Sequence, residues 1–99
     1  MDAALKEIYT QVERYVVPLI GGAQSFMSKE ENRILALQQI NRLNQRIGLL
    51  ARTQKDQVQE MKALQVHVNN LTIGVKNDNV GQIKHSLTLV RNYVWPQDD

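Results

Sequence analysis

The chain has 99 residues, enough for one small domain, and its few aromatic side chains mean that a core must be built mainly from Leu, Ile and Val. The absence of cysteine excludes a disulfide framework, a thiol nucleophile and a thiolate metal site. The formal net charge is +2, but residues 32–55 carry five basic side chains and no acid, whereas both flanking parts are mildly acidic.

No targeting or membrane-spanning segment is evident. The first residues lack the basic start and the apolar stretch of a secretory signal. The longest weakly polar stretch, residues 16–27, is shorter than the roughly 20 residues that span a bilayer. The sequence therefore predicts a cytoplasmic protein without a transmembrane segment.

The first predicted helix covers residues 3–17. Asp2 can cap its first amides, and apolar side chains recur on one face at Leu5, Ile8, Val12, Tyr15 and Val16. Pro18 disfavours helical geometry at the residue before it, and the glycine pair at 21–22 is a strong break. A linker is expected over 18–27.

The strongest pattern lies in residues 29–73. Ser28 and Glu31 form a capping-box signature at its start. Apolar residues then alternate at spacings of three and four, which is the heptad seam by which helices pair. The seam residues expected to bind a partner are Ile40, Leu43, Ile47, Leu50, Met61, Leu64 and Val68.

The seam is interrupted between its two halves, where its positions become Gln54 and Gln57. This stretch contains no Gly, Pro or Asn, and Gln, Lys and Arg are good helix formers. We therefore favour one long helix over 29–73, with a break near 53–56 as the alternative. One helix of that length would measure roughly 68 Å, so short flanking helices could not cover it and a second chain would be needed. A break would instead allow a compact four-helix bundle.

The last predicted helix covers residues 80–94. Turn-forming residues precede it, and Asp78 or Asn79 can cap it. Its apolar residues repeat with heptad spacing at Val80, Ile83, Leu87, Val90 and Val94. Pro96 ends the helix, and residues 95–99 are expected to form a frayed tail.

Together these elements predict a single all-α domain over residues 1–99, an antiparallel bundle of three to four helices with a long central coiled-coil-like helix. The expected function is non-enzymatic protein–protein interaction or oligomerisation through the heptad seams. The expected partner is a second copy of the chain or another helical protein, so a homo-oligomer or a small adaptor is predicted.

Nucleic-acid binding is the alternative function. It would use four residues of the basic block, Arg42, Arg46, Arg52 and Lys55, because basic side chains neutralise phosphates. In the heptad frame these residues surround the helix, and no aromatic residue lies among them to stack on bases. No cofactor, metal site or small-molecule substrate is expected, since His67 and His85 lack nearby ligand partners and no activated nucleophile is apparent.

Overall fold

The computed structural model describes residues 2–21 and 27–96, and within these ranges the chain is α-helical with no strand. The α-helices are α1 (Ala3–Val16), α2 (Lys29–Thr53), α3 (Val58–Lys76) and α4 (Val80–Val94). Two short 3-10 helices, η1 (Val17–Ile20) and η2 (Lys55–Gln57), follow α1 and precede α3. The prediction of an all-α helical bundle is confirmed.

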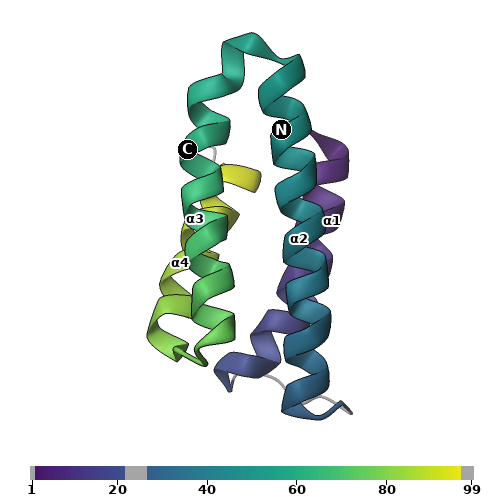
Figure 1. Cartoon of the computed structure of the whole chain (residues 1–99), viewed down its shortest axis with the longest axis vertical. Helices are drawn as coiled ribbons and strands as arrows, with labels where there is room; N and C mark the ends of the chain where they lie inside the picture. The colour runs from purple at the N-terminus through teal and green to yellow at the C-terminus, as the bar shows by residue number, and fades with distance from the viewer. Residues whose placement is uncertain (1, 22–26, 97–99) are drawn as a thin grey trace.

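Each helix runs antiparallel to the one before it (Figure 1). α1 packs on α2, α2 on α3 and α3 on α4, and α4 returns beside α1 with the loosest packing of the four sides. The bundle measures 41 × 30 × 21 Å. The two longest helices, α2 and α3, project beyond α1 and α4 at the end that carries the turn between them (Figure 1).

The core follows heptad spacing in every helix, because this spacing places one stripe of side chains toward the bundle axis. On α1 the buried stripe differs from the predicted one. Tyr9 is buried in the core, whereas Ile8 and Tyr15 are only partly buried and pack against the core from outside. On α4, Val80 is 41% exposed and does not join the core that was expected to include it. The buried residues of α1 and α4 are Leu5, Tyr9, Val12, Val16, Ile83, Ser86, Leu87, Val90 and Val94.

The continuous helix expected over residues 29–73 is wrong, and the alternative break near 53–56 is confirmed. α2 ends at Thr53, and Gln54 leaves helical geometry with φ −120° and ψ 86°. The helix propensities of Gln and Lys differ from those of other ordinary residues by only tenths of a kcal/mol per residue. Burying one Leu or Ile side chain contributes about 1.5–3 kcal/mol. Folding both halves of the seam against each other therefore outweighs the local preference for helix.

Side-chain caps begin α1, α2 and α4. In each helix the capping oxygen accepts a hydrogen bond from the amide three residues on, at 2.9 or 3.1 Å. The capping residues are Asp2, Ser28 and Asn79. α3 differs, because Gln57 at its start makes no side-chain capping hydrogen bond.

The turn between α3 and α4 is closed by backbone hydrogen bonds and one ion pair. The amide of Asp78 donates to the carbonyl of Val75 at 3.3 Å, and the amide of Asn79 donates to that of Gly74 at 2.9 Å. Asp78 has φ +53°, the left-handed conformation that ends many helices. Its carboxylate lies 2.6 Å from Nζ of Lys29, which lowers the pKa of Asp78 and joins this turn to the start of α2.

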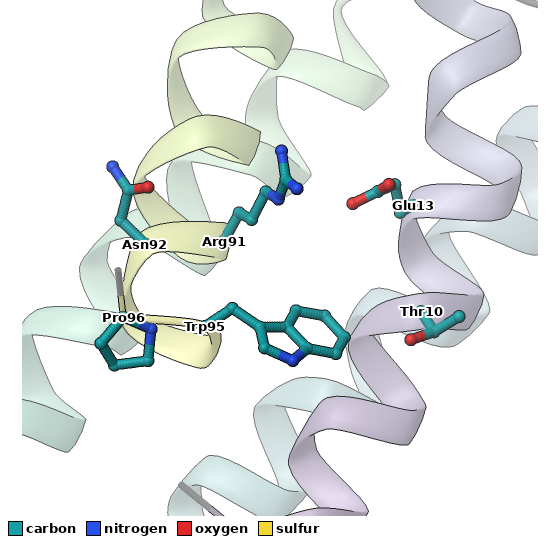
Figure 2. Close-up of a pocket in the computed structure, with 6 residues that line it drawn as sticks. All are labelled: Thr10, Glu13, Arg91, Asn92, Trp95 and Pro96. Atoms are coloured by element: carbon teal, nitrogen blue, oxygen red, sulfur yellow. The ribbon is translucent and has the colours of Figure 1, made fainter. Parts of the chain in front are cut away.

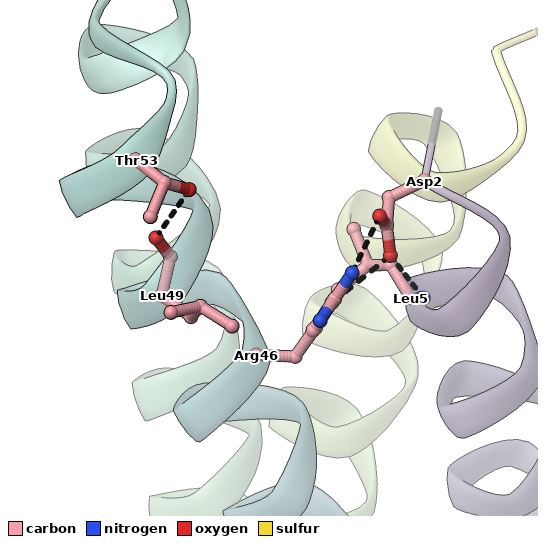
Figure 3. Close-up of polar contacts among 5 residues, drawn as sticks. All are labelled: Asp2, Leu5, Arg46, Leu49 and Thr53. Carbon is pink, nitrogen blue, oxygen red and sulfur yellow. Dashed lines mark hydrogen bonds and ion pairs between the residues drawn. The ribbon is translucent and has the colours of Figure 1, made fainter.

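Asp2 also holds α1 against α2 (Figure 3). Its Oδ1 accepts hydrogen bonds from the amide of Leu5 at 2.9 Å and from Nε of Arg46 at 3.1 Å. Its Oδ2 lies 2.8 Å from Nη2 of Arg46, so the two side chains pair through both oxygens. The hydrogen bond from Arg46 is the main cause of the lowered pKa of Asp2. One carboxylate therefore caps a helix and fixes its position.

We expect Asp2→Ala to destabilise the protein by about 1 kcal/mol through the lost cap, with a further loss from the ion pair. Asp2→Asn is the matched control, because asparagine caps as well as aspartate but carries no charge. Because the pKa of Asp2 is lowered on folding, its contribution is present above an ordinary carboxyl pKa of about 4 and is lost as pH falls through the folded-state value. Urea unfolding of both variants between pH 7 and pH 3 measures this. Equal stability of wild type and Asp2→Asn at pH 7 would contradict a role for the charge.

Candidate interaction site

A groove opens on the loosely packed side of the bundle, between α1 and α4 (Figure 2). It has a volume of about 470 Å³. Thr10 and Glu13 of α1 line it together with Arg91, Asn92, Trp95 and Pro96 from the end of α4. We call this the α1–α4 groove.

Trp95 forms one wall of the α1–α4 groove. It follows directly after α4, and its amide donates a hydrogen bond of 2.7 Å to the carbonyl of Arg91. Its indole packs edge-on against Tyr9, with ring centroids 5.6 Å apart and an angle of 72° between the planes. The side chain remains 39% exposed. A large aromatic surface is thus held in place by the core yet open to solvent.

The hydroxyl of Tyr9 is buried beside the groove. Tyr9 lines a neighbouring hollow of about 200 Å³ that shares Glu13 and Arg91 with the α1–α4 groove. Its Oη is buried and faces the carboxylate of Glu13. Burial, and then the carboxylate of Glu13, raise the pKa of Tyr9. The phenol therefore stays protonated at physiological pH, with Glu13 as the acceptor on its side of the groove.

Glu13 and Arg91 face each other from opposite sides of the α1–α4 groove. Figure 2 shows the carboxylate of Glu13 on α1 and the guanidinium of Arg91 on α4 pointing toward one another, with the Trp95 indole reaching toward Thr10. In the part of the chain that the structure describes, neither side chain forms an ion pair. The carboxylate of Glu13 also acts on the buried phenol of Tyr9, so Arg91 is the charge that remains open to a ligand in the groove.

The seven seam residues predicted to bind a partner lie inside the chain's own bundle. Each is at most 3% exposed, because the α2–α3 turn folds the two halves of the seam together. The set comprises Ile40, Leu43, Ile47, Leu50, Met61, Leu64 and Val68. Association through these side chains would require the bundle to open or to exchange helices between chains.

The four basic residues considered for nucleic acid are not gathered on one surface. Arg46 is engaged by Asp2 at the α1–α2 contact. Arg42 is exposed and donates a hydrogen bond of 2.8 Å to Gln39. Arg52 lies six residues after Arg46, which places it about 240° further around the helix, and Lys55 lies in the turn beyond it.

Residues 2–21 and 27–96 contain no group of three or more His, Asp or Glu side chains able to hold a metal ion. The ring of His67 contacts that of Tyr93, with centroids 5.6 Å apart, and His85 is exposed. Among the described helices, none combines the length and the apolar character needed to cross a bilayer.

The residues of the α1–α4 groove were missed in the sequence. Tyr9 stands four residues after Leu5 and three before Val12, so its heptad position was readable as part of the core. Trp95 was predicted only as part of a frayed tail over 95–99, whereas its ring packs against Tyr9. That Glu13 and Arg91 face each other could not be predicted from the sequence, because 78 residues separate them and their proximity depends on how the bundle closes.

Comparison with protein-family models, curated proteins and solved structures finds no match to this chain.

Proposed function

We propose that the chain is a non-enzymatic helical module that binds another protein, and that the α1–α4 groove receives a segment of that protein. The observation that carries the proposal is Trp95, a rigid and half-exposed aromatic wall beside the unpaired charge of Arg91. Tryptophan and arginine are the residues that most often dominate binding energy at protein interfaces. A wall fixed by the core also loses little conformational entropy on binding.

The hydrogen-bonding groups of the groove indicate the chemistry of the bound segment. Arg91 is the single cationic donor among the residues that line the groove, and the indole N–H of Trp95 can only donate. Glu13 is the single charged acceptor there, and it also acts on the buried phenol of Tyr9. The open guanidinium therefore favours a segment that presents a carboxylate to Arg91 and an apolar side chain to Trp95.

Selection of binders from a random peptide library on the folded protein tests the proposal. We expect the selected peptides to carry Asp or Glu next to a large apolar residue. Arg91→Gln should weaken their binding roughly tenfold to a hundredfold, because a charge-assisted hydrogen bond contributes about 1.5–3 kcal/mol. Trp95 is the only tryptophan, so its fluorescence reports occupancy of the groove directly.

Arg42→Gln is the matched control. It removes the same charge from an exposed arginine on α2, outside the α1–α4 groove. It should leave the affinity of the selected peptides almost unchanged at physiological salt. Selected peptides without acidic residues, or equal losses from the two arginine variants, would overturn the proposal.

A further inference from the structure

We propose that two copies of this chain exchange their α3–α4 halves by straightening the turn at residues 54–57, and so form a domain-swapped dimer. The inference concerns the α2–α3 turn and does not depend on what the α1–α4 groove binds. In the dimer, α2, the turn and α3 form one helix over 29–76, about 72 Å long. The α2 helix of each chain then packs on α3 of the other.

The turn has no local signal that requires it. It contains no glycine or proline, and neither η2 nor α3 begins at a side-chain cap. The residues that depart from helical geometry are Gln54, with ψ 86°, and Gln57, with φ −111° and ψ 8°. Glutamine is a good helix former, so returning both residues to helical geometry meets no steric barrier. The bend is held by packing of the two halves and by one backbone hydrogen bond within the turn, from the amide of Gln57 to the carbonyl of Gln54 at 3.0 Å.

The heptad frame continues through the turn without a change of register. Counting in sevens from Ile40 reaches Ile47, Gln54 and Met61, and counting from Leu43 reaches Leu50, Gln57 and Leu64. A connection that only reverses the chain has no need to preserve this register. An unbroken register is what a single helix requires to keep its apolar seam on one side.

Each half of the chain is a helical hairpin that can move as a unit. α1 packs chiefly on α2, and α4 on α3, so an exchange separates the α2–α3 contact, the looser α1–α4 contact and the small contact between η1 and α4. All three contacts form again between chains. The turn also projects beyond α1 and α4, so the straightened segment does not run into them (Figure 1). The exchanged form therefore keeps the monomer's core, and protein concentration selects between the two.

The α2–α3 pairing fixes the symmetry axis of the dimer. Nδ2 of Asn44 lies 3.4 Å from Oδ1 of Asn69, so these positions face each other across the α2–α3 contact. Their midpoint along the chain lies at residues 56–57. In the exchanged dimer the two long helices therefore cross near Gln57, and the two copies of this side chain meet close to the axis.

Cross-linking with single cysteines tests the exchange, because the natural chain has none. Asn44→Cys and Asn69→Cys chains are unfolded, mixed, refolded at high concentration and treated with a short bis-maleimide. We expect covalent dimers joining one chain of each kind. Asn44→Cys alone is the control, because its two copies would lie about 38 Å apart along the paired helices. Mixing the two folded proteins without unfolding should give little product.

Two variants of the turn shift the equilibrium in opposite directions. Gln54→Leu with Gln57→Leu completes the seam and should strengthen the dimer tenfold or more, because burying one leucine corresponds to about a tenfold change. Lys55→Pro should keep the protein monomeric, because proline is tolerated at the first position of η2 but not inside a continuous helix. A mixed sample that cross-links no better than Asn44→Cys alone would overturn the proposal. So would a double-leucine variant that stays monomeric at every concentration.

Discussion

Leu64→Asp is expected to abolish the folded state at neutral pH. Leu64 is fully buried in α3, within the core shared by all four helices. A carboxylate at this position would have to remain buried without a partner or take up a proton, and either outcome costs several kcal/mol. Domains of this size are stable by only about 5–15 kcal/mol. Circular dichroism should therefore show the loss of most helical signal.

Val66→Asp is the matched control for this change. Val66 lies two residues further along the same helix and is 56% exposed. The same introduced charge there should change stability by no more than about 0.5 kcal/mol. If the seam joined separate chains, Leu64→Asp would instead give a folded protein of lower mass. A folded Leu64→Asp variant would contradict the closed bundle.

Gly74→Ala is expected to destabilise the protein by about 1–3 kcal/mol, although alanine is the better helix former. An added Cβ at Gly74 would lie 3.1 Å from the backbone nitrogen of Ile83 and 3.2 Å from its Cγ1. That nitrogen donates a 2.9 Å hydrogen bond to the carbonyl of Asn79, so it cannot move without disturbing the start of α4. Glycine is therefore needed for the close approach of α3 and α4. Chemical denaturation gives the change in unfolding free energy.

Gly48→Ala provides the opposite expectation for the same substitution. An added Cβ there meets only the ends of the Arg52 and Gln65 side chains, each at 3.9 Å. Gly48 lies inside α2, five residues before its end, so alanine should stabilise the protein by up to about 1 kcal/mol. If both variants are more stable than the wild type, α3 and α4 do not approach each other at Gly74 as closely as the structure shows.

Local signals made the helix ends predictable. Asp2, Ser28 and Asn79 stand immediately before their helices, and each satisfies amides that the helix itself leaves without partners. The last helix has the predicted bounds of 80–94 because a turn-rich segment precedes it and Pro96 follows it. At these places the chemistry that decides the structure lies within a few residues.

The bend at Gln54 and the α1–α4 groove depend instead on contacts between distant parts of the chain. Local propensity favoured a helix through Gln54, and only the burial of Ile47 and Leu64 in one core favours the bend. Similarly, Tyr9 and Trp95 are brought together by the return of α4 to α1. A pattern read along one helix carries no information on which helix will cover it.

The bend is the central structural claim, and small-angle X-ray scattering with a mass measurement at low protein concentration tests it most directly. The closed bundle predicts an 11.4 kDa monomer with a radius of gyration close to the 13.2 Å of its Cα atoms. It also predicts a longest dimension near the 41 Å of the bundle. A particle approaching the roughly 70 Å of an unbroken helix, at every dilution, would show that the chain does not close on its own seam.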